Sequence, residues 1–163
     1  MKVFHLFDNK NVMAHILTKD TFDEFLLSEV KIVGKATVHL TGTPAEGFFS
    51  EDQLDERGYV SYGLLRPICL EMIKGQKTPE SFTFMFLLPT PRLENFLDET
   101  DSTLQSFDVE NLSFLVRYKD GELTLTTGSA FKIFTMDKSI NTAWDSWVEK
   151  YLNSCGISFE EML

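Results

Sequence analysis

The sequence predicts an α+β fold, in which helices pack against a curved, mainly antiparallel sheet of about six strands. Three observations lead to this prediction. Asp120-Gly121 separates two alternating segments, which is the pattern of a two-residue β-hairpin. Strands and helices do not alternate regularly along the chain, and this argues against a doubly wound parallel sheet. Roughly four or five helices are expected from apolar residues at helical spacing, most clearly between Ile140 and Leu152.

The N-terminal part carries a short β-prone segment and two helix-start signals. Lys2–Phe7 is predicted to be a strand, and Asp8 after it is expected to cap a helix whose apolar stripe ends at Leu17. A second residue of the same type, Asp20, precedes Phe22, so we expect another helix to begin there.

Residues 29–41 alternate apolar and polar side chains with a period of two. This predicts one long strand with a wet face and a dry face, in which Gly34 marks a bulge or a close backbone approach. The length of this strand and Gly34 are also the reasons to expect a curved sheet. The following residues 41–59 are irregular and acidic, and we expect Phe48 and Phe49 to pin this loop to the core.

The middle of the chain predicts a helix, a strand and a second helix. Residues 61–74 carry an apolar stripe, and Pro67 lies either near the start of this helix or at a kink. Ser81–Leu88 is apolar on both faces, which is typical of a central strand. A short helix is expected around Leu93–Leu97. Residues 98–110 carry five acids and no base, and we expect a mobile surface loop there.

The C-terminal part begins with the hairpin. The two-residue turn pairs Leu112–Lys119 with Glu122–Thr127 and sets Val116 opposite Leu125, so the turn type and the alternation agree. A further strand is expected over Ala130–Met136.

The last helix is expected to begin at Asp137 or Ser139 and to end at Gly156. Both tryptophans of the chain lie on its wide apolar stripe, which indicates that this helix packs on the sheet.

Composition and charge limit the class of protein. The chain has 163 residues, of which 43% are apolar, and we expect a single globular domain over residues 1–163. There are 25 Asp and Glu against 15 Lys and Arg, and the net charge of −10 argues against nucleic-acid binding. Neither a membrane-spanning run nor the apolar stretch of a signal peptide is present in the sequence. We therefore expect a soluble, cytoplasmic protein.

The ionisable side chains show no catalytic or metal-binding spacing. The three histidines (His5, His15 and His39) lack the spacing of a zinc site, and Cys69 and Cys155 form no CxxC pair. Adjacent acids point apart on a helix or strand, so they are poor acid–base pairs. The sequence thus predicts no catalytic residue, no metal site and no cofactor.

One segment inverts the charge of the chain. Residues 61–79 carry three bases against a single acid. The bases are Arg66, Lys74 and Lys77. We interpret them as the rim of a binding pocket near residues 61–82, for a protein partner or an anionic small molecule. The alternative is that they only pair with the acidic loops at 46–57 and 98–110.

The stretches Arg66-Pro67 and Ile73–Pro79, together with Phe134–Ser139 and the following Trp144-Asp145, form a distinctive pattern. They resemble an uncharacterised domain family of unknown function from gut Firmicutes of the clostridial group. The likeness covers nearly the whole chain. The resemblance implies a bacterial cytoplasmic protein, and it brings no ligand or catalytic residue with it.

Three functional hypotheses follow. The first is a non-enzymatic binding or interaction domain, because the chain has one basic segment and no catalytic pattern. The alternative is a hydrolase-like enzyme whose carboxylate site assembles only in the fold, which clustered acids, or acids beside His39, would support. The third is a structural subunit, in which a second chain covers an apolar patch on the helix of Trp144 and Trp147. The sequence leaves the oligomeric state open.

Overall fold

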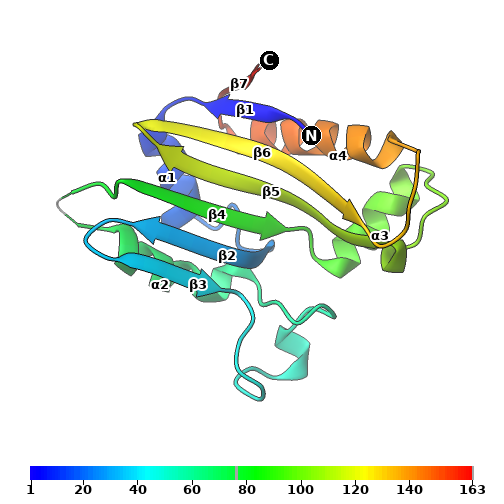
Figure 1. Cartoon of the computed structure of the whole chain (residues 1–163), viewed down its shortest axis with the longest axis horizontal. Coiled ribbons are helices and arrows are strands. Elements are labelled where there is room, and N and C mark those ends of the chain that lie inside the picture. Colours follow the sequence, from blue (N-terminus) through cyan, green and yellow to red (C-terminus); the bar gives the residue numbers. More distant parts are fainter. Residues whose placement is uncertain (76, 163) are drawn as a thin grey trace.

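Seven strands form one open sheet in the computed structural model, which describes every residue except Gln76 and Leu163 (Figure 1). The strands are β1 (Val3–Leu6), β2 (Leu26–Val33), β3 (Thr37–Thr41), β4 (Ser81–Leu87), β5 (Val109–Lys119), β6 (Glu122–Phe131) and β7 (Phe159–Met162). Their order across the sheet is β3-β2-β4-β5-β6-β1-β7, and all neighbours are antiparallel. The predicted α+β class is confirmed, and β4 lies inside the sheet as expected.

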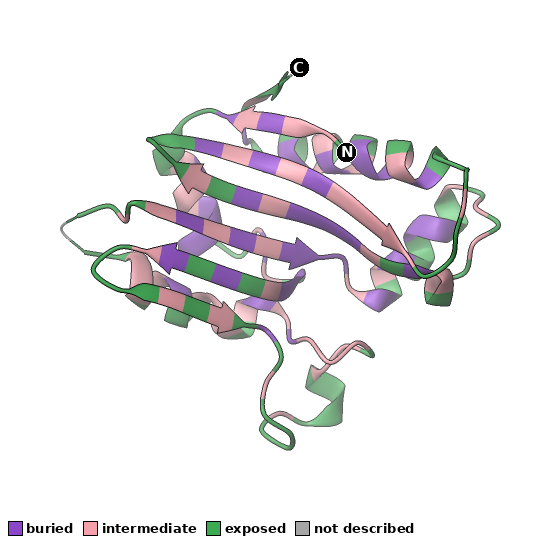
Figure 2. Ribbon diagram, viewed as in Figure 1, coloured by how far each residue is buried: buried purple, intermediate pink, exposed green. Residues whose placement is uncertain are grey.

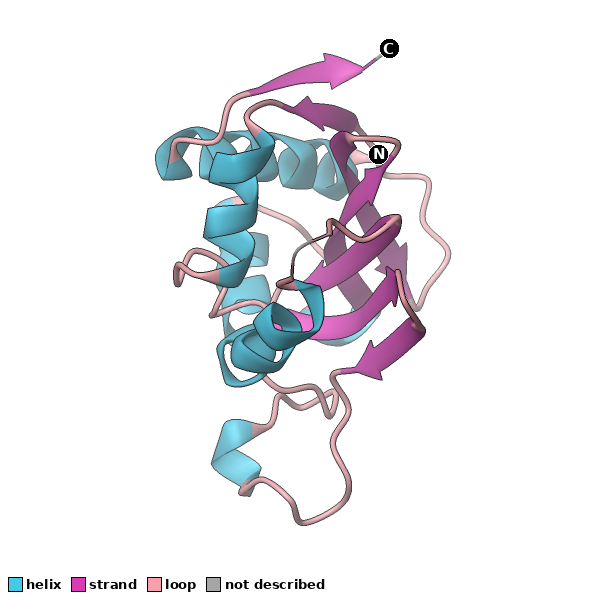
Figure 3. Ribbon diagram, turned by 90° about the vertical axis from the view of Figure 1, so that its left-hand side faces the viewer, coloured by secondary structure: helices cyan, strands magenta, loops and turns pink. Residues whose placement is uncertain are grey.

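The helices lie against one face of this sheet (Figure 3). They are α1 (Asn9–Leu17), α2 (Tyr62–Ile73), α3 (Thr90–Glu99) and α4 (Ser139–Cys155), with short 3-10 helices at η1 (Glu51–Gln53) and η2 (Ser106–Asp108). Burial alternates along the strands (Figure 2). The buried side chains of the alternation, such as Phe84, Val116 and Leu125, form the core together with the helices.

The β5–β6 hairpin has the predicted register. Asp120 and Gly121 have φ angles of 53° and 80°, the left-handed values that a type I′ turn requires. Val116 lies opposite Leu125, and Tyr118 lies opposite Leu123. The cap at the first helix is also confirmed, because the Asp8 carboxylate accepts a hydrogen bond from the Asn11 backbone N–H at 3.2 Å.

The single strand predicted over 29–41 is wrong, because the chain turns back there to form a second hairpin. β2 pairs with β3, with Ile32 opposite Val38 and Val30 opposite Leu40. The turn is centred on Lys35, so even-numbered residues on both strands share one face. A hairpin with this register keeps apolar and polar residues alternating through the turn. The sequence pattern is therefore the same for one long strand and for two short strands.

Two further segments differ from the expectation. Asp20 starts a turn instead of a helix, because its carbonyl accepts from the Asp23 N–H at 3.1 Å and the Phe25 carbonyl is taken by the Tyr62 N–H at 2.8 Å. The strand expected over Ala130–Met136 ends at Phe131, whose partner Val109 is the first residue of β5. One further backbone hydrogen bond follows, from the Lys132 N–H to the Asp108 carbonyl at 2.8 Å, and Asp108 belongs to η2 and not to a strand.

The long loop between β3 and α2 is anchored by Asp55 and Arg57. Of the two aromatic residues expected to pin it, Phe48 is 75% exposed, and Phe49 is half-buried and contacts the Phe48 ring. The Asp55 carboxylate, whose side chain is 4% exposed, accepts from the backbone N–H and the hydroxyl of Thr90, both at 2.9 Å. Arg57 donates to Asp55 at 3.1 Å and to the carbonyl oxygen of Leu88. Asp55 thereby caps the first turn of α3, whose own N-cap residue is a proline.

Asp55→Asn should lower the free energy of unfolding by roughly 2–4 kcal/mol at neutral pH, because a carboxamide accepts fewer hydrogen bonds than the buried carboxylate. Burial alone would raise the pKa of Asp55, but the hydrogen bonds from Thr90 and Arg57 outweigh it and hold the pKa below its usual value. A depressed pKa stabilises the fold above the unfolded-state pKa, and this contribution is lost as the pH falls through the folded-state pKa. Urea unfolding from about pH 7 to pH 2 measures both effects. Equal stability and equal acid sensitivity of the two proteins would contradict this role.

Candidate functional site

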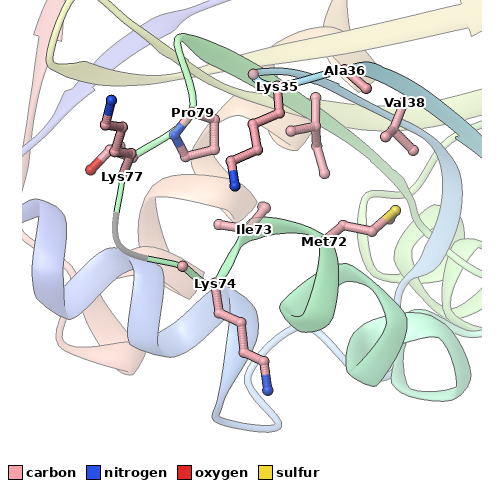
Figure 4. A pocket seen from close by; sticks show the side chains of 12 residues that line it. Lys35, Ala36, Val38, Met72, Ile73, Lys74, Lys77 and Pro79 are labelled. Atoms are coloured by element: carbon pink, nitrogen blue, oxygen red, sulfur yellow. The ribbon is translucent and has the colours of Figure 1, made fainter.

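A groove of about 670 Å³ lies between the β2–β3 hairpin and the C-terminal end of α2. Its floor is apolar and includes Ile32, Val38, Met72, Ile73 and Pro79. Its rim carries three lysines, Lys35, Lys74 and Lys77 (Figure 4). The lysines come from both sides of the groove: the Lys35 side chain points across it toward Ile73, whereas the Lys74 side chain points away from it.

The hairpin and the end of α2 position these side chains. Lys35 lies at the tip of the β2–β3 turn. Lys74 is the C-cap of α2, and its backbone N–H donates to the Leu70 carbonyl at 2.8 Å. The chain then returns to the sheet, where the Glu80 N–H donates to the Val33 carbonyl at 2.8 Å. The segment that carries Lys77 is therefore anchored at both ends.

The rim lysines differ in their partners. Lys74 forms an ion pair with Glu71 at 2.6 Å, and both side chains are more than half exposed. Lys35 and Lys77 form no ion pair with any side chain that the structure describes. No acidic residue is among the described residues that line the groove. The groove is thus a positive site on a chain whose net charge is −10.

The structure brings two of the three predicted rim residues together. Lys74 and Lys77 line the groove, whereas Arg66 is not among its lining residues. The Arg66 guanidinium instead makes a two-point contact with Asp23, with Nε–Oδ1 at 2.8 Å and Nη2–Oδ2 at 3.2 Å. The alternative prediction was that these bases pair with the acidic loops at 46–57 and 98–110. The partners of Arg66 and Lys74 both lie outside those loops. Lys35 was missed, because its turn was interpreted as the middle of a strand.

The other titratable side chains are dispersed. His39 lies 3.0 Å from Glu29 on the exposed sheet edge, with one carboxylate beside it. His15 is buried at the end of α1 and contacts the Thr21 hydroxyl at 2.6 Å. Burial raises the pKa of the Cys69 thiol to about 11. Within the described residues there is no group of three or more His, Cys, Asp or Glu side chains that could hold a metal ion.

The apolar stripe of α4 faces the core. Trp144 is 1% exposed, and its indole N–H donates to the Ser113 carbonyl at 2.9 Å. Trp147 is partly buried and stacks between Trp144 and Tyr151. The patch that a structural subunit would present on this helix is therefore largely used inside the molecule. None of the helices described here is long and apolar enough to cross a bilayer.

Comparison with known proteins identifies a family without an assigned activity. Residues 15–160 match the sequence profile of a family of unknown function (DUF5721). The chain belongs to this family. The match includes both walls of the groove, and it confirms the resemblance to an uncharacterised family. No curated protein and no solved structure matches the chain.

In this DUF5721 chain, Arg66→Ala should lower the free energy of unfolding by about 1 kcal/mol, because it removes a partly buried two-point contact with Asp23. A double-mutant cycle with Asp23→Ala, followed by urea unfolding, measures the coupling between the two side chains. Additive effects of the two substitutions would show that this ion pair does not hold Arg66.

Proposed function

We propose that this chain is a non-enzymatic binding module, and that its groove takes a ligand with an apolar body and an anionic group. The observation that carries the proposal is the rim of Lys35, Lys74 and Lys77 around an apolar floor without a lining carboxylate. The groove volume of about 670 Å³ falls in the range of small-ligand and peptide sites. Apolar contact would supply much of the affinity, and the lysines would set the orientation.

The charge of the whole chain supports the choice of an anion at this place. A net charge of −10 repels anions over most of the surface. An anionic ligand is therefore favoured only where several cations gather without acidic neighbours, as Lys35 and Lys77 do. The same charge disfavours an extended polyanion such as nucleic acid, which would contact a larger surface.

The groove lining favours binding over catalysis. The described residues that line the groove include no carboxylate, imidazole or thiol. Their reactive side-chain groups are lysine amines and the Thr78 hydroxyl. The dispersed acids and the single carboxylate beside His39 do not favour the hydrolase-like alternative.

The proposal includes a single domain in the bacterial cytoplasm. An acidic chain with one continuous sheet and two free cysteines suits a reducing compartment.

Binding of 11-(dansylamino)undecanoic acid, measured by fluorescence titration, tests this proposal. The methyl ester of the same compound is the matched neutral ligand. Lys35→Glu and Lys77→Glu should each weaken binding of the acid at least tenfold, which corresponds to about 1.4 kcal/mol. Lys74→Glu should also weaken it, and all three should change binding of the ester little.

Lys150→Glu on α4 is the control, because it makes the same charge change on an exposed lysine that does not line the groove. Equal affinities of all four variants and the unmodified chain would overturn the proposed site. An equal loss in Lys150→Glu would show a general effect of net charge, and it would also overturn the site.

A further inference from the structure

We propose that the occupant of the groove is a second copy of this chain, which inserts the tip of the loop between β3 and α2. The loop tip, defined here as residues 45–52, carries an exposed phenylalanine and exposed acidic side chains. The inference rests on the proposed function, because it names the partner of the same groove. Three observations support it: the chemistry of the loop tip, its position away from the groove of its own chain, and the lysines of the groove.

A tight turn presents an apolar ring at the loop tip. The Phe48 N–H donates to the Ala45 carbonyl at 3.1 Å, and Gly47 between them has a φ of 77°, the value that a type II turn requires at its third residue. Phe48 is 75% exposed, and its ring lies edge-on to that of Phe49, with centroids 5.1 Å apart. The backbone of the turn therefore holds this ring where a partner can contact it.

Carboxylates flank this ring in the sequence. Glu46, Glu51 and Asp52 are all exposed, and none of them belongs to an ion pair in the described part of the chain. Residues 46–56 contain no Lys or Arg. The loop tip thus combines an apolar group with anions, which is the ligand chemistry that we propose for the groove.

The loop tip lies away from the groove of its own chain. β3 begins beside the groove, which Val38 lines, and runs to Thr41, where the loop starts. The loop projects from the body of the molecule, at the end of β3 opposite the β2–β3 turn (Figures 1 and 3). None of residues 45–52 is among the described residues that line the groove. A contact between loop tip and groove therefore joins two copies of the chain.

The lysines of the groove supply the matching charge. Lys35 points across the groove toward Ile73, and Lys77 lines it from the segment that follows α2 (Figure 4). Two copies with a net charge of −10 repel each other, but at physiological ionic strength salt screens charges that are more than about 8 Å apart. Charges in direct contact are screened less, so the acids of the loop tip and the lysines of the groove select this arrangement of the two copies.

The loop tip and the groove are different surfaces, so the contact is heterologous and joins the copies head to tail. Each copy offers one loop tip and one groove, and association can therefore continue into a ring or a filament. A short loop tip buries less area than a stable dimer interface does. We therefore expect weak association, with a dissociation constant between about 10 µM and 1 mM.

Sedimentation equilibrium of the full chain over this concentration range tests the self-association. The average mass should rise above that of one copy, and Phe48→Ser and Lys77→Glu should each raise the dissociation constant at least tenfold. Phe107→Ser is the matched control for the loop tip, because Phe107 is 70% exposed and lies on η2. Lys150→Glu is the control for the groove. Both controls should change the dissociation constant by less than about twofold.

A mixture of two variants tests whether the contact is head to tail. The Phe48→Ser copy keeps its groove, and the Lys77→Glu copy keeps its loop tip. Each should remain a monomer alone, and together they should form a one-to-one dimer. This dimer should not grow, because its remaining loop tip and its remaining groove both carry substitutions. A mixture that stays monomeric at concentrations where the unmodified chain associates would overturn the head-to-tail contact.

Competition tests the shared groove without any substitution. The dansylated acid should dissociate the assembly of the unmodified chain, because the acid and the loop tip of the second copy occupy the same groove. Association that persists when the acid saturates the chain would overturn the inference even if a variant proved to be unfolded.

The outcomes separate this inference from the proposed function. If the dansylated acid binds at the groove but the chain stays a monomer at about 1 mM, the groove holds a small molecule, and the inference fails while the proposed function stands. If the chain associates but Phe48→Ser or Lys77→Glu leaves the association unchanged, the copies meet at another surface and the inference fails. An equal loss in Lys150→Glu would show a general effect of net charge and would also overturn it. If the unmodified chain binds neither the acid nor a second copy, the proposed function itself fails.

Discussion

The three phenylalanines of β4 join the sheet to the helices, and the position of the groove depends on them. Phe82, Phe84 and Phe86 are all buried. Phe86 contacts the ring of Tyr62, the first residue of α2, with centroids 5.0 Å apart, and the Tyr62 hydroxyl donates to the Ile16 carbonyl at 2.8 Å. Each such aromatic pair contributes about 0.5–1.5 kcal/mol beyond simple burial. The start of α2 is thereby fixed to the central strand and to α1.

The same strand fixes the other wall of the groove. Ile32 of β2 lies opposite Phe82, so β4 holds the β2–β3 hairpin in register with the core. The groove lies between this hairpin and the end of α2, with Ile32 and Val38 on one side and Ile73 on the other. These apolar residues belong to regular elements held by the core, whereas Lys35 and Lys77 lie in the turn and the connecting segment at the rim.

Local signals in the sequence were sufficient for some elements and insufficient for others. The turn at Asp120-Gly121 was predictable, because its backbone conformation depends on the two residues themselves. The β2–β3 turn was not, because a turn centred on Lys35 leaves the alternation of its flanking strands unchanged. The short strand β7 depends on its pairing with β1, which lies at the other end of the chain. Its own residues, Phe159–Met162, carry too short a pattern to predict a strand.

The candidate site, like the fold, could be predicted from the sequence only in part. The excess of base around Lys74 and Lys77 was visible in the sequence, and the structure places both residues at one groove. The contact of Arg66 with Asp23 joins residues that are distant in the sequence, so no local charge count could reveal it. Lys35 joins the rim only because the chain reverses there. The charge of a site can be predicted from the sequence, but the membership of the site requires the fold.

The most direct test of the groove is an amide-resolved NMR titration of the isotope-labelled chain with the dansylated acid. The account predicts that the largest shift changes fall on Lys35, Ala36 and Val38 of the hairpin and on Ile73 and Lys77 across the groove. Amides of α4, such as that of Lys150, should move little. Changes concentrated away from the hairpin and the end of α2, or spread evenly over the chain, would contradict a binding groove at this place.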